Sequence, residues 1–196
     1  MYTWGYIKNV TLAKLDLDEG EANVMNLLSR FMYYANEAIV QISSTVKPKH
    51  TFYEIVIDDT NLDTLITMPS DFIAFGDDVN YVIYDDPLLD RKIRRRTDDE
   101  DFTYVGNNQI CFHTLGKFFI SYDALWIFFT DQSESTILEV PVDILNCLPS
   151  YIASQCMKID DQYKASELRN EYEILLARIN DTNYKNTKTF KIEGDW

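Results

Sequence analysis

The spacing of apolar residues changes twice along the chain, and these two changes constrain the fold more than any other sequence feature. Over residues 19–44, apolar residues recur at steps of three and four, which predicts a helix with one buried face. Residues 50–130 instead hold short runs of β-branched and aromatic residues between polar turns, which is typical of antiparallel strands. The helical spacing returns over residues 143–180. We expect the buried stripes of these helices to include Leu28, Phe31, Ile152, Leu168 and Leu175.

These segments predict one α+β domain. Its architecture is two or three long helices packed together, with a small antiparallel β-sheet or sandwich inserted between them. A chain of 196 residues is long enough for one domain with a substantial core and short for two. We expect this domain to span residues 19–181, after an extended leader over residues 1–18.

The last segment, residues 182–196, is predicted to form a C-terminal arm. The arm begins as a polar stretch and then places Phe190, Ile192 and Trp196 at even spacing. Even spacing puts these side chains on one face of an extended strand. Two placements are open on physical grounds: the arm folds back onto the chain's own sheet, or it docks on another protein by strand addition or aromatic insertion.

The charge balance is strongly acidic, with one local exception. The chain carries 32 acidic and 18 basic residues, and its net charge of −14 disfavours general adhesion to nucleic acids and anionic membranes. Residues 85–101 nevertheless hold five of the basic residues, bracketed by acidic ones. A solvated, self-neutralising loop is the plain interpretation, and a contact with phosphates, as in DNA, or with an acidic protein surface is the alternative. The candidate contact residues are Arg91, Lys92, Arg94, Arg95 and Arg96.

Signals for catalysis are sparse. The sequence contains no glycine-rich motif for binding nucleotide phosphates. Cys111 and His113 would share a face of a strand, so a thiolate–imidazole pair is one route to a hydrolase, although such pairs are more often structural. A pair of carboxylates is a second route, but 32 acidic residues produce such pairs by chance. The acidic candidates are Glu54, Asp58, Asp59, Asp77 and Asp78.

Metal and targeting signals are sparse as well. Cys111, Cys147 and Cys156 form no Cys-x-x-Cys pair, and neither histidine has metal-ligand spacing from one. We therefore expect buried, reduced thiols in an intracellular protein, with no metal and no cofactor. The N-terminus lacks the pattern of a signal peptide, and no stretch approaches the ~18 apolar residues of a membrane span. These features favour an intracellular interaction protein that is not an enzyme. A monomeric interaction protein and a carboxylate- or Cys/His-based hydrolase are both left open.

Three short segments near the N-terminus add a resemblance to a known family. They read TWGYI at residues 3–7, AKLD at residues 13–16 and YANEA at residues 34–38. Together they resemble the head–tail connector proteins of crAss-like bacteriophages.

The order of elements also resembles the adaptor family of short-tailed phages. In that family an N-terminal helix precedes a Leu-Pro-x-Asp-Phe-like element, here MPSDF at residues 68–72. A β insert follows, and an Ile-Pro-x-Asp-like element, here VPVD at residues 140–143, starts the C-terminal helices. The closing helix carries an Ala…Glu-Tyr-Glu pattern, here Ala165 and residues 171–173.

This resemblance implies a structural virion protein of the phage neck, assembled in the host cytoplasm. Its implied partners are copies of itself in a ring of about twelve, the portal protein, and tail or neck proteins. The ring would extend the DNA channel for genome ejection, with DNA passing through without sequence-specific binding and with no membrane contact. In this setting we expect the basic residues of segment 85–101 to contact a partner or DNA, and the C-terminal arm to dock on a neighbouring subunit or the portal.

Overall fold

The computed structural model describes residues 2–24, 26–75, 81–86, 88, 91–96, 100–126, 129–130 and 134–186. The chain divides into two compact units. The helical unit comprises Met1–Lys47 and Trp126–Trp196, and the β unit comprises Pro48–Leu125. The predicted α+β class is confirmed, and the β unit corresponds to the insert predicted over residues 50–130.

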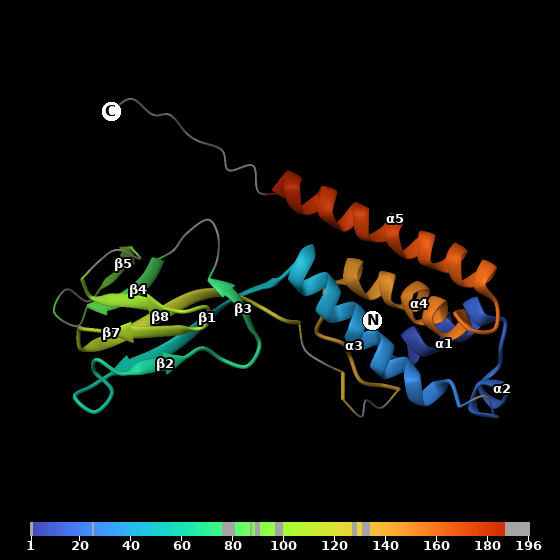
Figure 1. Cartoon of the computed structure of the whole chain (residues 1–196), viewed down its shortest axis with the longest axis horizontal. Coiled ribbons are helices and arrows are strands. Elements are labelled where there is room, and N and C mark those ends of the chain that lie inside the picture. The colour runs from blue at the N-terminus through green and yellow to red at the C-terminus, as the bar shows by residue number, and fades with distance from the viewer. Residues whose placement is uncertain are drawn as a thin grey trace. The chain divides into compact units, whose positions relative to one another are not determined.

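The helical unit is built from both ends of the chain (Figure 1). Its helices are α1 (Trp4–Leu15), α2 (Glu19–Val24), α3 (Leu28–Thr45), α4 (Val142–Met157) and α5 (Gln162–Asn186). Within the described residues, no helix is both long and apolar enough to cross a membrane.

The extended leader predicted for residues 1–18 is wrong, because most of it forms α1. Thr3 caps this helix: its hydroxyl oxygen accepts a hydrogen bond from the Tyr6 amide at 3.2 Å. The helix ends at Asp16, which adopts the left-handed conformation with φ 58°. The buried apolar residues of α1 are Trp4, Ile7, Leu12 and Leu15, which recur at steps of three to five.

The single helix predicted over residues 19–44 is also wrong, because the segment forms two helices, α2 and α3. Asn26 lies between them in the left-handed conformation, with φ 55°, which asparagine tolerates better than most residues. The Leu27 amide donates to the Ala22 carbonyl at 2.9 Å and closes the turn. The break redirects the chain between the two helices.

The second helical region, predicted over residues 143–180, forms α4 and α5. Because α5 extends to Asn186, the arm predicted over residues 182–196 begins as helix and not as an extended strand. The residues predicted to dock, Phe190, Ile192 and Trp196, lie outside the described residues.

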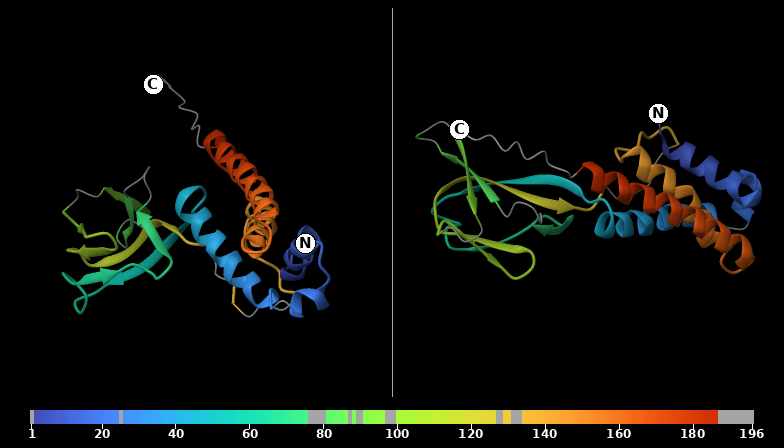
Figure 2. Two further views of the ribbon diagram at one scale, coloured as in Figure 1. Left: turned by 45° about the vertical axis from the view of Figure 1, so that its right-hand side comes forward. Right: turned by 90° about the horizontal axis from the view of Figure 1, so that it is seen from above.

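One hydrophobic core joins the helices of this unit (Figure 2). The central helix is α4, which contacts α1, α3 and α5 and is therefore buried on several sides. Among the residues predicted to be buried, Phe31, Ile152 and Leu168 are buried, whereas Leu28 and Leu175 are only half-buried.

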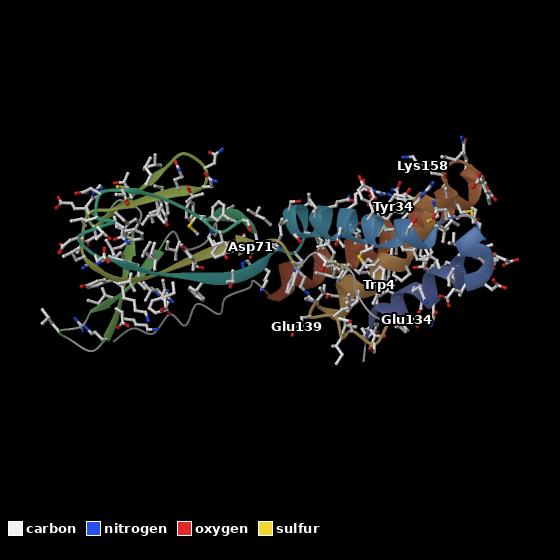
Figure 3. All side chains as sticks on the ribbon, turned by 90° about the horizontal axis from the view of Figure 1, so that it is seen from below. Trp4, Tyr34, Asp71, Glu134, Glu139 and Lys158 are labelled. Carbon is white, nitrogen blue, oxygen red and sulfur yellow. The ribbon has the colours of Figure 1, made fainter. Side chains whose placement is uncertain are left out.

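Gly5 and Asn36 tie α1 and α3 to the segment that precedes α4. The Gly5 amide donates to the Glu134 carbonyl at 2.9 Å, and a Cβ at Gly5 would lie 2.9 Å from the same oxygen, so only glycine fits this approach. The Asn36 side chain donates to the Phe129 carbonyl at 2.8 Å and accepts from the Phe129 amide at 2.7 Å. Trp4, labelled with Glu134 in Figure 3, packs its ring 5.6 Å from that of Phe129. Trp4, Gly5 and Asn36 belong to the segments that carry the N-terminal resemblance.

The β unit consists of two antiparallel sheets that share one core. The larger sheet has the order β1-β8-β4-β5, with β3 also paired to β8, and the smaller has the order β2-β7-β6. The sheets thus take the sandwich form of the predicted insert. The strands are β1 (Lys49–Ile57), β2 (Leu65–Thr67), β3 (Phe72–Phe75), β4 (Tyr81–Asp86), β5 (Arg91–Arg96), β6 (Phe102–Val105), β7 (Gln109–Phe112) and β8 (Gly116–Ala124).

Strand β8 separates the inside of this sandwich from the outside. Phe118 and Ile120 are fully buried, whereas Phe119 and Ser121 lie on the opposite face. The Phe118 ring stacks 4.3 Å from that of Phe112 in the smaller sheet. The core between the sheets is therefore largely aromatic.

The motif at residues 68–72 forms the turn that leads into β3. The Phe72 amide donates to the Pro69 carbonyl at 3.0 Å. Asp71, labelled in Figure 3, accepts from the Tyr122 hydroxyl at 3.1 Å through its side chain and from the Leu125 amide at 2.8 Å through its carbonyl. This motif therefore connects the start of β3 to the end of β8 within the β unit.

The motif at residues 140–143 starts α4. Pro141 is the N-cap residue, and its carbonyl accepts from the Leu145 amide at 3.0 Å. Asp143 lies in the first turn, where the helix dipole favours a negative charge, and its Oδ2 pairs with Lys47 Nζ at 2.6 Å. This motif therefore joins the end of the first helical segment to the start of the second.

Candidate functional site

The basic residues of segment 85–101 lie in a strand, β5, and not in a loop. β5 forms an antiparallel hairpin with β4 and is an edge strand, because among the described strands β4 is its only partner. The solvated loop that the charge pattern favours for this segment is therefore wrong for residues 91–96. These residues fold as a strand because the β4 backbone pairs with them along their whole length.

The alternation of β5 sends its basic side chains to opposite faces of the larger sheet. Arg95 lies opposite Val82, which is fully buried in the core. Arg94 lies opposite Ile83, and Lys92 opposite Asp85, on the outward face. The side chain of Arg96 lies outside the described residues. The five residues predicted as one contact group are therefore divided by the sheet.

Arg95 lies on the inward face of the larger sheet and is half-buried. Its Nη1 pairs with Asp101 Oδ2 at 2.7 Å, and its guanidinium lies 5.4 Å from the centre of the Tyr84 ring. Its Nε is buried and makes no hydrogen bond, which is an energetic cost that the ion pair must offset. We infer a structural role for Arg95 and remove it from the candidate contact group.

Lys92 and Arg94 instead extend a solvent-exposed surface that we call the open face. Lys92 Nζ lies 4.1 Å from the centre of the Phe119 ring, and Lys117 Nζ lies 5.1 Å from the same ring. Phe52 and Val56 of β1 are on this face and are 59% and 58% exposed. The open face consists of Phe52, Glu54, Val56, Ile83, Asp85, Lys92, Arg94, Lys117, Phe119 and Ser121.

The open face combines cations with exposed apolar side chains. Large apolar residues that alternate outward from a sheet are normally replaced by polar ones when that face meets only water. Cations beside them favour an acidic partner surface or phosphates. Glu54 pairs with Lys117 at 2.8 Å, and Asp85 lies directly opposite Lys92. The open face is therefore mixed in charge, with Lys92 and Arg94 as its exposed cations.

Cys111 and His113 lie at β7 and its end, as the sequence predicts, and a third residue joins them. His113 Nδ1 is 2.6 Å from Asp63 Oδ1, and His113 Nε2 is 3.1 Å from the Thr103 hydroxyl. Cys111 is 9% exposed. One histidine nitrogen thus faces a carboxylate and the other a hydroxyl. Among the described residues no hydrogen bond joins Cys111 to His113, so the direct thiolate–imidazole contact of the hydrolase alternative is not formed.

The other cysteines are unsuited to nucleophilic chemistry. Burial, with the nearby negative charge of Asp143, raises the pKa of the Cys147 thiol to about 12. Burial also raises the pKa of Cys156 to about 11, although Arg30 opposes the shift. Both thiols remain protonated near neutral pH, as expected for structural residues.

Two of the candidate carboxylates, Asp58 and Glu54, are engaged in other contacts. Hydrogen bonds from the Thr60 hydroxyl and amide hold the pKa of Asp58 below its ordinary value, so Asp58 is a turn-capping carboxylate and not an acid. Glu54 pairs with Lys117. Asp77 and Asp78 lie outside the described residues.

Sequence reasoning missed a polar groove between α4 and α5. Its volume is about 590 Å³, and Lys158 and Arg169 are among its lining residues. Arg169 is held there by Glu173 at 2.6 Å and by the Tyr151 and Tyr172 rings at 5.3 and 5.0 Å. No local pattern could have revealed this groove, because it is created by the packing of two helices.

No protein-family model matches the chain, and comparison with curated proteins finds no match. Function therefore has to be inferred from the residues of the chain and from the resemblance described above.

Proposed function

We propose that the chain is a head–tail connector subunit, which forms a ring between the portal and the tail of a phage and extends the DNA channel. The observation that carries this proposal is the order of the elements. A helical unit built from both chain ends receives an antiparallel β unit between α3 and α4. This is the order that the resemblance to phage adaptors implies.

The positions of the resemblance motifs support the same proposal. The motifs at residues 68–72 and 140–143 each connect two elements of the fold. Gly5 and Asn36 hold α1 and α3 against the segment before α4. Residues that hold a scaffold together are expected to recur in proteins that share the scaffold. A chance resemblance would place such residues without regard to these connections between elements.

The uneven distribution of charge supports association with other copies. The chain has a net charge of −14, whereas the open face presents Lys92 and Arg94 beside exposed apolar residues. Exposed cations beside apolar side chains on one face, with acidic surface elsewhere, favour head-to-tail contacts between copies, and such contacts close into a ring when the rotation permits. The acidic balance also weakens DNA binding by the ring, which suits a channel through which DNA must move.

The direct test is co-expression of this chain with the portal protein encoded by the same genome. Size-exclusion chromatography with native mass spectrometry measures the complex, and electron microscopy shows its symmetry. The proposal expects a ring of about twelve copies stacked on the portal. A portal that leaves the chain monomeric, or a genome that encodes the chain and no portal protein, contradicts the proposal.

A further inference from the structure

Asp63, Cys111 and His113 converge from two separate segments of the β unit. One donor atom from each residue lies within 4.8 Å of the donor atoms of the other two. Asp63 belongs to the turn between β1 and β2, whereas Cys111 lies in β7 and His113 directly follows it. The three donors are a thiol, an imidazole and a carboxylate.

The backbone holds this arrangement in place. Asp63 adopts the left-handed conformation with φ 55°, and its amide donates to the Phe112 carbonyl at 2.9 Å. The amide of His113 donates to the Asp101 carbonyl at 2.8 Å. Because β-strand side chains alternate, Cys111 and His113 lie on the same face on either side of Phe112. The fold thus fixes the backbone of both Asp63 and His113 beside β7.

The three residues differ in burial: Cys111 is buried, whereas His113 and Asp63 are open to solvent. Cys111 is 9% exposed, while the side chains of His113 and Asp63 are 39% and 66% exposed. An ion could therefore enter from solvent and reach a thiolate in a less polar environment. The Thr103 hydroxyl, 3.1 Å from His113 Nε2, lies beside the same group.

We propose that Asp63, Cys111 and His113 bind one divalent cation of the zinc class. Thiolate and imidazole ligands favour zinc over magnesium or calcium, and a carboxylate oxygen is a common third ligand. A fourth position remains for water. On binding, Cys111 loses its proton and the ion replaces the hydrogen bond between Asp63 and His113.

This exchange requires a small movement. The Asp63 Oδ1 to His113 Nδ1 distance is 2.6 Å, whereas two ligands in a tetrahedral zinc site are about 3.3 Å apart. Asp63 lies in an exposed turn, so its side chain has room to move outward. The proposal does not depend on the connector function, and its test distinguishes the two.

The test uses the full chain without a metal-binding tag. Titration calorimetry with Zn²⁺ should give one ion per chain, and Co²⁺ should produce the near-ultraviolet thiolate-to-metal charge-transfer band. Asp63→Asn, Cys111→Ser and His113→Gln should each weaken Zn²⁺ binding by at least about 10- to 100-fold, the loss seen for outer-shell partners alone. Cys111→Ser should also abolish the Co²⁺ band.

His50 provides a matched control. His50 Nδ1 lies 2.5 Å from Asp123 Oδ1, but among the described residues no third metal-ligating side chain joins this pair. His50→Gln should therefore leave both signals unchanged. If Cys111→Ser fails to fold, the exposed Asp63→Asn variant still decides the matter. Absence of the Co²⁺ band in the wild type, equal Zn²⁺ affinity of Asp63→Asn and the wild type, or an equal loss in His50→Gln overturns the proposal.

Discussion

The helical unit and the β unit use their basic residues differently. In the helical unit, lysines pair with carboxylates that are distant in the sequence: Lys14 with Glu171 at 2.7 Å, and Lys164 with Asp16 at 2.6 Å. In the β unit, Lys92 and Arg94 have exposed side chains on the open face. The β unit also pairs Arg95 with Asp101 and Lys117 with Glu54, but it keeps two cations of one strand, Lys92 and Arg94, exposed beside apolar side chains. This difference suggests a scaffold and a contact surface within one chain.

The two units also differ in their cores. The helical core is formed by the apolar stripes of α1, α3 and α5, which pack around α4. The β core depends on stacked aromatic rings between two sheets. A core made of a few large rings has few ways to compensate for the loss of one. We therefore expect the units to respond separately to core substitutions.

The largest expected effect tests whether the two cores are separate. Phe118→Ala and its match in the helical unit, Phe31→Ala, should each lower the free energy of unfolding by about 3–5 kcal/mol, because both side chains are fully packed. Hydrogen exchange should increase mainly within residues 48–125 for Phe118→Ala and mainly outside them for Phe31→Ala. If either substitution accelerates exchange equally in both units, the units unfold as one and the comparison fails.

The next effect concerns the turn that starts β8. Gly116 has φ +145°, and a Cβ there would overlap the Tyr84 ring. Gly116→Ala should therefore lower the free energy of unfolding by about 3 kcal/mol, the sum of backbone strain and overpacking. Gly106→Ala is the control: Gly106 has φ +65° with open space around it, so strain alone should cost about 1 kcal/mol. Chemical denaturation measures both, and equal losses would show that the Tyr84 contact is unimportant.

A smaller effect tests the internal ion pairs of the helical unit. Lys8 is buried, with a side chain 10% exposed, and pairs with Glu19 at 3.0 Å and with Glu134. Burial acts to lower the pKa of Lys8, but the hydrogen bonds and charges of Glu134 and Glu19 outweigh it, so the pKa is raised. Lys8→Met should cost about 1–2 kcal/mol at neutral pH, since the two carboxylates remain hydrated.

The pH dependence of this effect has a defined direction. Because the pKa of Lys8 is higher in the folded state, its contribution is fully present below the unfolded lysine pKa of ~10.4. The contribution is lost as the pH rises from there through the folded pKa. The difference in unfolding free energy between the wild type and Lys8→Met should therefore be constant from neutral pH to about 10 and shrink above it. Lys14→Met, which removes a more exposed pair, should cost only about 0.5 kcal/mol. Equal costs for the two variants would contradict the assigned role of burial.

The smallest effect on stability tests the open face. Replacing Lys92 and Arg94 together by Ser should change the free energy of unfolding by less than about 1 kcal/mol, because both are exposed and only a cation–π contact is lost. Assembly with other copies or with the portal should weaken at least tenfold and lose its salt dependence. The charge-matched control replaces Arg30 and Lys158, both exposed in the helical unit. Sedimentation analysis that shows the same loss in both double variants indicates a general charge effect, and no loss in either indicates that β5 charges only protect a sheet edge.

Periodicity was sufficient to predict several parts of this fold. Local spacing predicted the antiparallel insert and the buried helical stripes that contain Phe31, Ile152 and Leu168, because helices and strands bury side chains at fixed intervals. The turn at residues 106–108 between β6 and β7 is likewise local, because it contains asparagines and a glycine with positive φ, which are typical turn residues. These features depend on neighbours in sequence.

Local spacing failed where a distant segment decided the outcome. Residues 4–15 are helical because α1 packs on α4 and its glycine meets Glu134. β5 is a strand because β4 pairs with it, although its composition is that of a charged loop. The division of Arg95 from Lys92 and Arg94 follows from that pairing.

The candidate sites show the same division of information. The residue types indicated only part of the chemistry: the basic residues favoured anionic partners, whereas the spacing of the cysteines and histidines predicted no metal site. The arrangement of the site residues does not follow from their types. Asp63 and His113 are separated by 50 positions and meet only when β2 pairs with β7. Side-chain chemistry is a local property of the sequence, whereas proximity depends on long-range backbone pairing, which no window of neighbouring residues contains.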